Sequence, residues 1–214
     1  NMQEPNIKIN CHSSICIDEN IFIDPFNINY QAEAKAIFIT HSHFDHLDIN
    51  SIKNILTPNT VIVCTKDSAE ILEKAGITNN INIVTPNQTG KVLDISFQTF
   101  PSYNFGHHHF KNYGFVGYTL NVNGTTYTIC GDTDATPELE NVKTDVLLIP
   151  IGGIYTMDAE EAAKVTNIIK PKYVIPTHYN YLDDTAGKEG EKLFTKLVDK
   201  NIKVLIKIAV SYTH

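Results

Sequence analysis

Ala36-Ile37-Phe38-Ile39-Thr40 runs without a break into His41-Ser42-His43-Phe44-Asp45-His46. The first five residues form a continuous apolar run, which is typical of a buried strand. The six residues that follow are expected to form a loop at the carboxyl end of that strand. They include three histidines and one aspartate, and both residue types are common ligands of transition metals. The loop can turn His41 and His43 toward one ion and Asp45 and His46 toward another.

The rest of the chain alternates short apolar runs with helical patterns. Asn123-Gly124 separates two of these runs and predicts a tight hairpin. Strands are expected at Ile7–Ile9, Ser14–Ile17, Ile21–Ile23, Ala36–Thr40, Val61–Cys64, Ile81–Val84, Lys91–Thr99, Val116–Val122, Thr125–Cys130, Val146–Ile149, Tyr173–Pro176 and Lys203–Ile208. Helices are expected at Asp48–Leu56, Asp67–Ala75, Asp158–Ile169 (with Asp158 as N-cap) and Gly190–Lys200. This order predicts an α/β fold, an αββα sandwich of four layers with two mixed sheets and outer helices. No linker or repeat divides the chain, so we expect one domain over residues 1–214.

Composition excludes several classes of protein. With 42% hydrophobic and 19% charged residues among 214, the chain can bury a sizeable core. Its net charge of −7 and the lack of a Lys/Arg cluster argue against a nucleic-acid partner and favour a small-molecule substrate. No apolar run approaches the about 20 residues that span a bilayer. The first residues show no signal-peptide pattern, and the four cysteines are far apart without a CxxC. We therefore expect no membrane partner, free thiols and a cytoplasmic location.

Two later polar residues also follow predicted strands. Asp132 lies in Gly131-Asp132-Thr133-Asp134, just after the run that ends at Cys130. His178 lies in Pro176-Thr177-His178-Tyr179, after the run Tyr173–Pro176. Because α/β folds build sites at the carboxyl ends of strands, these two side chains are candidates to join the histidine loop in one site.

The segment Thr40–Asp48 (THSHFDHLD) resembles the HxHxDH signature of the metallo-β-lactamase superfamily. Asp24-Pro25-Phe26, GDTD and PTHY are similar to further motifs of that superfamily, in the same order, from Ile7 to about Leu205. The blocks Pro101-Ser102-Tyr103-Asn104, GDTDATPE and PIGGIYTMD resemble a small bacterial branch of metal-dependent hydrolases. That branch is related to the ascorbate-6-phosphate lactonases.

The resemblance implies a dinuclear metal site. His41 and His43 would bind the first ion with a third histidine; Asp45, His46 and His178 would bind the second, and Asp132 would bridge both. The third histidine lies among His107, His108 and His109, and Asn104 stands where related proteins often carry histidine. Counting back from Gly117-Tyr118 favours His109, with the other two left open. Without any of them the first site is under-coordinated, which would favour one ion. Two divalent ions are expected, with zinc favoured and manganese, iron or nickel compatible.

Further residues are expected to support the metal site or to contact the substrate. Asp24 is expected to accept a hydrogen bond from a ligand histidine and fix its tautomer. His12, in a motif that resembles the family's Gly-His-x-Ser, is expected to play a supporting part, as are Thr40 and Asp134. The residues Tyr155, Thr156 and Met157, after Gly152-Gly153, are expected to line the substrate pocket.

The predicted function is metal-dependent hydrolysis of a small polar ester or lactone by a metal-bound hydroxide. Asp45 is the predicted catalytic residue, which would orient the hydroxide and move its proton. One alternative is a phosphodiesterase or nuclease of the same superfamily, although the acidic pI argues against large RNA. Thiol-ester or persulfide chemistry with one iron and a non-catalytic metal-binding or sensing protein are the others. An antibiotic-degrading β-lactamase is not expected, because the sequence shows no export signal.

Overall fold

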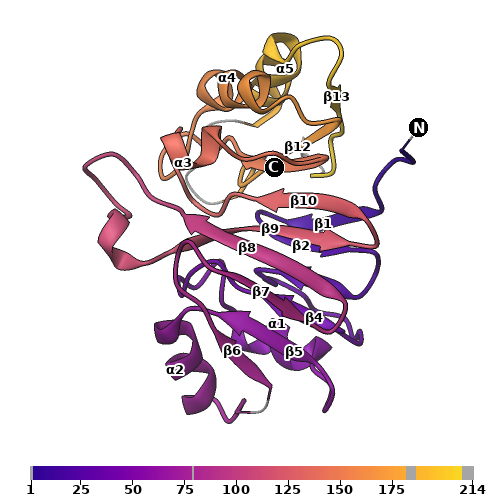
Figure 1. Ribbon diagram of the computed structural model, residues 1–214, viewed down its shortest axis with the longest axis vertical. Helices are drawn as coiled ribbons and strands as arrows, with labels where there is room; N and C mark the ends of the chain where they lie inside the picture. The colour runs from indigo at the N-terminus through magenta and orange to yellow at the C-terminus, as the bar shows by residue number, and fades with distance from the viewer. Residues whose placement is uncertain (1, 79, 182–186, 209–214) are drawn as a thin grey trace. The chain divides into compact units, whose positions relative to one another are not determined.

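The computed structural model describes residues 2–78, 80–181 and 187–208. It divides into two compact units, Asn1–Thr85 and Pro86–His214. Each unit contains one sheet (Figure 1). The prediction of a single domain over 1–214 stays a prediction. No helix in the described part of the chain combines the length and the apolar character needed to cross a bilayer.

The first unit is a six-stranded sheet with two helices. The strands lie in sequence order, antiparallel from β1 to β3 and parallel from β3 to β6. Their bounds are β1 Ile7–Cys11, β2 Ser14–Ile17, β3 Ile21–Ile23, β4 Ala36–Phe38, β5 Val61–Cys64 and β6 Ile81–Ile83, and the helices are α1 Ile49–Ile55 and α2 Lys66–Lys74. Alternate strand residues such as Ile37 and Ile62 form a core with Ile52 of α1 and Leu72 of α2. The continuous apolar character of β4 arises because its residues are buried on both faces.

The second unit is a seven-stranded mixed sheet in the order β13-β12-β11-β10-β9-β8-β7. Strands β7 to β10 are antiparallel, and β10 to β13 are parallel. Their bounds are β7 Thr89–Val92, β8 Ile95–Pro101, β9 Val116–Val122, β10 Thr125–Ile129, β11 Val146–Pro150, β12 Tyr173–Thr177 and β13 Lys203–Val204, with helices η1 Lys111–Tyr113, α3 Pro137–Glu140, α4 Ala159–Ile169 and α5 Gly187–Leu197. Helices α4 and α5 lie side by side (Figure 1). Helix α4 also packs on β11. The predicted pair of mixed sheets with helices is thus confirmed.

The predicted start of α4 is confirmed in detail. The carboxylate of Asp158 accepts a hydrogen bond of 2.8 Å from Glu161 N, and the Glu161 carboxylate accepts one of 3.2 Å from Asp158 N. This capping box satisfies two amide groups that the first turn of a helix otherwise leaves without a partner.

The prediction of one strand over Lys91–Thr99 is wrong. The chain reverses at Leu93-Asp94, where β7 and β8 form an antiparallel hairpin in which Val92 pairs with Ile95. Leu93 adopts a left-handed backbone conformation with φ of 53°, which is costly for a side chain with a Cβ. The turn escaped prediction because an apolar residue occupies the position where asparagine or glycine normally marks a hairpin.

We predict that Leu93→Asn is more stable than Leu93→Ala by about 1 kcal/mol, because both variants lose the leucine contacts but asparagine tolerates the left-handed region better. Urea unfolding of the two variants measures the difference. Equal stabilities would mean that the turn relaxes to another conformation.

Candidate metal centre

The histidine loop is a tight turn that gathers three imidazoles in the first unit. It follows β4, and the amides of His46 and Leu47 both donate to His43 O, at 2.9 and 2.8 Å. The turn brings the ring centroids of His41 and His46 to 4.1 Å and those of His41 and His43 to 4.8 Å. His41 and His46 are buried, whereas His43 is exposed. The loop therefore offers convergent imidazole nitrogens of the kind that transition metals bind.

Asp24 supports the histidine loop by accepting hydrogen bonds from Thr40 and His46. Its side chain is completely buried at the end of β3. Its Oδ1 accepts a bond of 2.8 Å from Thr40 N, and its Oδ2 accepts one of 2.6 Å from Thr40 Oγ1 and one of 2.7 Å from His46 Nδ1. A proton on Nδ1 leaves the lone pair of His46 on Nε2. Thr40 Oγ1 lies 2.9 Å from His41 Nδ1 and can accept a hydrogen bond from it. Both histidines are then held as the tautomer that binds a metal through Nε2.

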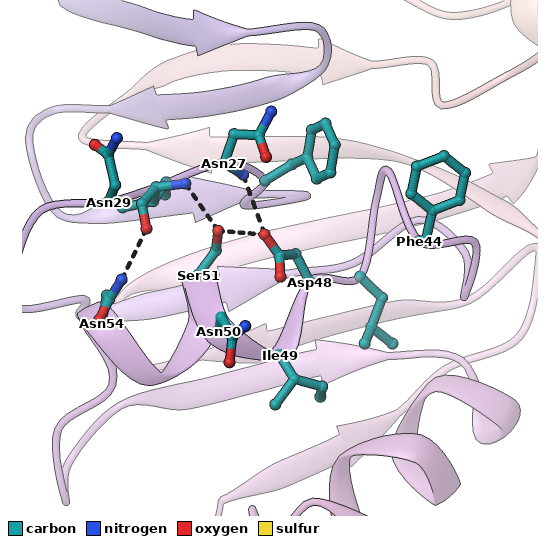
Figure 2. Close-up of a pocket in the computed structure, with 11 residues that line it drawn as sticks. Asn27, Asn29, Phe44, Asp48, Ile49, Asn50, Ser51 and Asn54 are labelled. Carbon is teal, nitrogen blue, oxygen red and sulfur yellow. Dashed lines mark hydrogen bonds between the residues drawn. The ribbon is translucent and has the colours of Figure 1, made fainter. Parts of the chain in front are cut away.

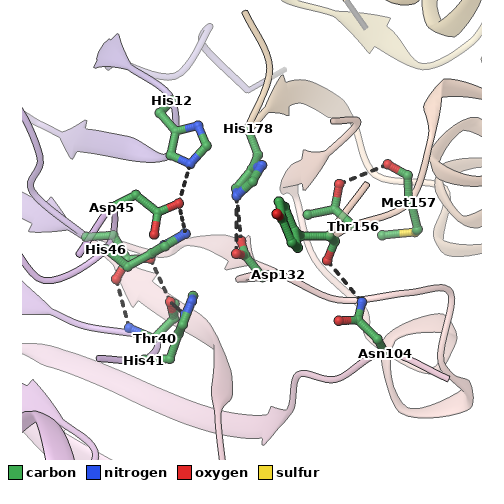
Figure 3. Close-up of polar contacts among 12 residues, drawn as sticks. His12, Thr40, His41, Asp45, His46, Asn104, Asp132, Thr156, Met157 and His178 are labelled. Carbon is green, nitrogen blue, oxygen red and sulfur yellow. Dashed lines mark hydrogen bonds and ion pairs between the residues drawn. The ribbon is translucent and has the colours of Figure 1, made fainter. Parts of the chain in front are cut away.

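His12 contacts the carboxylate of Asp45, the residue predicted to be catalytic. It lies in the turn between β1 and β2 in a left-handed conformation with φ of 56°. Its Nε2 lies 2.8 Å from Asp45 Oδ2, and the same oxygen lies 3.5 Å from His46 Nε2 (Figure 3). One potential ligand atom from each of these three residues lies within 4.8 Å of the others. Two ligand atoms on one ion, each at about 2.0–2.2 Å, lie roughly 3.3 Å apart at a tetrahedral angle, so the 3.5 Å separation of Asp45 and His46 suits a shared ion.

A second hydrogen-bond network fixes the middle of the loop. Ser42, between two of the histidines, donates a bond of 2.7 Å to Asp67 Oδ2 at the start of α2. Thr65 Oγ1 and Ser68 N donate to Asp67 Oδ1 at 2.6 and 3.0 Å. Burial raises the pKa of Asp67, but these hydrogen bonds outweigh it and the net pKa is lowered. Sequence reasoning missed Asp67 as a positioning residue because its place at a helix start has a complete local explanation.

In the second unit, Asp132 and His178 form a buried pair (Figure 3). They follow β10 and β12, which are both parallel to β11, so their carboxyl ends lie at the same edge of the sheet. His178 Nε2 lies 3.1 Å from Asp132 Oδ1 and 3.2 Å from Oδ2. His178 Nε2 can donate to this carboxylate when it carries the proton, and it can bind an ion when it does not. These separations are also those of two ligands of one ion.

Of the three candidate histidines in the second unit, only His109 is buried, with 4% of its surface exposed. His107 and His108 are both exposed. Asn104 holds His109 in place by two bonds: Asn104 N donates to His109 O at 2.7 Å, and His109 N donates to Asn104 Oδ1 at 3.0 Å. The amide of Asn104 also donates to Asp134 Oδ1 and to Tyr155 O. Asn104 thus closes the loop rather than presenting a ligand atom.

Glu138 of α3 fastens the chain on both sides of these histidines. Its carboxylate accepts a bond of 2.8 Å from Tyr103 Oη and pairs with Lys111 Nζ at 2.9 Å. Burial raises the pKa of Glu138, but the bonds from Lys111 and Tyr103 outweigh it, and its pKa is lowered. The Lys111 side chain is exposed and that of Glu138 is half-buried, so solvent screens the ion pair and it contributes little to stability. By contacting Tyr103 and Lys111, Glu138 helps to fix the position of the loop that carries His109.

The three residues predicted to line the substrate pocket differ in their exposure to solvent. Tyr155 is 42% exposed, and its ring lies 4.8 Å from that of His108. Met157 is completely buried, so the prediction that it lines a pocket is wrong. Thr156 is 4% exposed and donates to Met157 O at 3.0 Å. Only Tyr155 of the three presents much surface to a ligand.

The donor set fits a metal that accepts nitrogen and oxygen. The four cysteines are free thiols. Burial raises the pKa of Cys16 to about 11 and that of Cys64 to about 12, so both stay protonated at neutral pH. The ligands on offer are therefore imidazoles and carboxylates, a set that suits zinc, iron, manganese or nickel better than a thiolate-bound ion.

Comparison with known proteins agrees with this chemistry. The model of the β-lactamase superfamily domain matches residues 7–178. A UPF0173 metal-dependent hydrolase from Pyrococcus furiosus is 33% identical over 214 residues, which cover 91% of this chain and 92% of that protein. A crystal structure of a protein from Parabacteroides distasonis has 28% identity and a TM-score of 0.79, and covers 96% of this chain and 94% of its own. The metallo-β-lactamase fold protein YhfI from Bacillus subtilis has 12% identity and a TM-score of 0.67, with 94% and 89% covered. The predicted metallo-β-lactamase fold is thus confirmed.

We predict that Asp24→Asn lowers metal affinity by about 10- to 100-fold, because a carboxamide has one acceptor oxygen and cannot accept all three bonds that the two carboxylate oxygens receive from Thr40 N, Thr40 Oγ1 and His46 Nδ1. It should also lower the free energy of unfolding by about 2 kcal/mol. Competition with a chelating dye measures the affinity. Asp199→Asn, the same change at an exposed position, is the control. Wild-type affinity in Asp24→Asn would remove Asp24 from the support of the site.

Gly152→Ala tests the position of His178. A Cβ at residue 152 would lie 2.5 Å from His178 O and 3.2 Å from its Nδ1, so the backbone of one of the two residues must shift. We expect metal affinity to fall on the order of tenfold, as for other displaced supports of a ligand. Calorimetric metal titration measures it, and far-UV circular dichroism checks the fold. An unchanged affinity in a folded variant would show that His178 is not a ligand or adapts freely.

Proposed function

Because the chain belongs to the β-lactamase superfamily and to the UPF0173 family of metal-dependent hydrolases, we propose that it hydrolyses a small polar ester or lactone with two divalent ions, zinc foremost. The observation that carries the proposal is the tautomer control in the histidine loop, where Asp24 and Thr40 are placed to accept hydrogen bonds from Nδ1 of His46 and His41. A histidine that carries its proton on Nδ1 can bind a metal ion through Nε2.

The proposed ligands are the residues that match the family's motifs. His41, His43 and His109 would hold one ion, Asp45, His46 and His178 the other, and Asp132 would bridge. The burial of His109 and the exposure of its two neighbours support its choice over His107 and His108. The pairs Asp45–His46 and Asp132–His178, at 3.5 and 3.1 Å, support a shared ion for each pair.

When bound, the ions would polarise the substrate oxygen and lower the pKa of water toward about 7, which makes a hydroxide nucleophile available at neutral pH. Asp45 would orient the attacking water and take its proton at a carboxylate oxygen. His12, at 2.8 Å from Asp45 Oδ2, would hold that carboxylate in one orientation. Asp24 and Thr40 would keep His46 and His41 from rotating.

An uncharged or weakly charged small substrate suits the chain better than nucleic acid. The net charge of −7 offers no electrostatic attraction to a polyphosphate backbone. The cytoplasmic location and the absence of a membrane partner remain part of the proposal. The relation to ascorbate-6-phosphate lactonases also stays a prediction, and it is one reason to include lactones among the test substrates.

The test of the proposed function is turnover of matched substrates by the zinc-loaded chain. We expect simple esters and lactones to be hydrolysed and Asp45→Ala to lose activity by on the order of 10²–10⁴-fold, the usual contribution of a positioned base. The variant should still fold. Cleavage of bis(p-nitrophenyl) phosphate in preference to every ester would favour the phosphodiesterase alternative. Metal binding without any turnover would favour a sensing protein.

Metal content tests the ligand assignment. We expect two ions per wild-type chain by elemental analysis and a fall toward one in His109→Ala. His107→Ala, the same change two residues away at an exposed position, should keep both ions. One ion in the wild type, unchanged in His109→Ala, would overturn the dinuclear proposal.

A further inference from the structure

A polar pocket of about 690 Å³ lies beside the histidine loop, within the first unit (Figure 2). Its lining comes from the turn after β3, the end of the histidine loop and the first turns of α1. Eleven residues line it: Phe26, Asn27, Ile28, Asn29, Phe44, Leu47, Asp48, Ile49, Asn50, Ser51 and Asn54.

Two residues of the histidine loop segment, Phe44 and Leu47, line the pocket beside the proposed ligands in the sequence. Phe44 separates His43 from Asp45, and Leu47 follows His46 directly. The Phe44 side chain is 64% exposed, and its ring meets that of Phe26 edge to face at 6.1 Å. The exposed Phe44 ring offers an apolar surface at the edge of the pocket on which a ligand can pack. A group bound in this pocket is therefore close in the chain to the residues that would do the chemistry.

The wall behind the pocket is rigid. Asp48 Oδ2 accepts a bond of 3.1 Å from Asn27 N and one of 2.6 Å from Ser51 Oγ. Ser51 Oγ accepts a further bond of 2.8 Å from Ile28 N. Both contacts of the carboxylate fall on one oxygen, so Oδ1 of Asp48 is available to accept from a ligand hydroxyl.

Two amides on the rim are also available. The side chains of Asn29 and Asn50 are exposed and make no hydrogen bond with the residues that the structure describes, whereas Asn54 donates to Ile28 O at 2.8 Å and accepts from Gln31. Each free carboxamide offers one acceptor and two donor hydrogens. Such groups match neighbouring hydroxyls, which both donate and accept.

The charge of the lining disfavours anions. Among the described residues that line the pocket, Asp48 is the charged one, and they include no lysine, arginine or histidine. A phosphate or carboxylate bound here would be repelled by this carboxylate, and no cationic side chain of the lining would offset the repulsion. Phe44, which is exposed, and Ile49, which is half-buried, instead offer apolar surface beside the amides. The lining thus suits an uncharged group with hydroxyls on its edge and C–H bonds on its face.

We propose that this pocket binds an uncharged, hydroxyl-rich ring, such as an unphosphorylated sugar, as the recognised part of the substrate. The proposal rests on the proposed function only in calling the bound group a substrate; binding itself needs no metal.

The test is an NMR titration of the metal-stripped, ¹⁵N-labelled chain with methyl β-D-glucopyranoside, and in parallel with glucose 6-phosphate and phenyl phosphate. The neutral glucoside should shift the side-chain amide signals of Asn29 and Asn50. Asn50→Ala and Asp48→Asn should each weaken its binding at least fivefold. Asn59→Ala, at an exposed turn outside the pocket, should bind like the wild type.

Two results would overturn the proposal. One is the absence of shifts at Asn29 and Asn50 with the glucoside; the other is tighter binding of either phosphate at the same signals. Neither result depends on hydrolysis, because metal is absent from the titration. Conversely, glucoside binding by a chain that shows no esterase activity would reject the proposed function and leave the pocket assignment intact.

Discussion

The burial of one carboxylate, Asp24, governs the geometry of the histidine loop. A charged group without exposure to water requires strong hydrogen-bond donors around it. Asp24 obtains three, from the amide and hydroxyl of Thr40 and from His46 Nδ1. Because Asp24 follows β3 and Thr40 follows β4, the parallel pairing of these strands sets where the donors lie. The cost of leaving the carboxylate unsatisfied therefore keeps the loop in the arrangement that a metal needs.

Backbone strain is concentrated at the same positions. His12, Asp24 and His178 all have φ between 48° and 57°, although each carries a Cβ that disfavours the left-handed region. All three lie just after a strand or in a turn between strands, and each side chain contacts a proposed ligand or is one. Strain of this kind persists only where surrounding contacts hold it.

Periodicity and local chemistry predicted most of the fold and part of the site. Strands such as β2 and β9 match their predicted bounds because buried β-branched runs have few other conformations. The hairpin at Leu93 was missed because its turn residue is apolar. Sequence spacing alone did not decide which of His107, His108 and His109 is the third histidine ligand. The structure buries His109, which Asn104 holds by a hydrogen bond, and sequence spacing does not reveal that contact. The Ser42–Asp67 bond joins residues 25 positions apart and has no local signature.

The support of the ligands and the lining of the pocket come from the same two segments. Residues 24–29 carry Asp24 at one end and Asn27 and Asn29 at the other, while residues 40–51 carry the histidines and then Asp48. The bond from Asn27 N to Asp48 Oδ2 joins the two segments again beyond the metal ligands. A change that displaces the pocket wall therefore strains the histidine loop as well. Exposed rim residues such as Asn29 and Asn50 make no such bond with the described residues, so under the pocket proposal they are the positions where substrate preference can change without disturbing the proposed metal ligands.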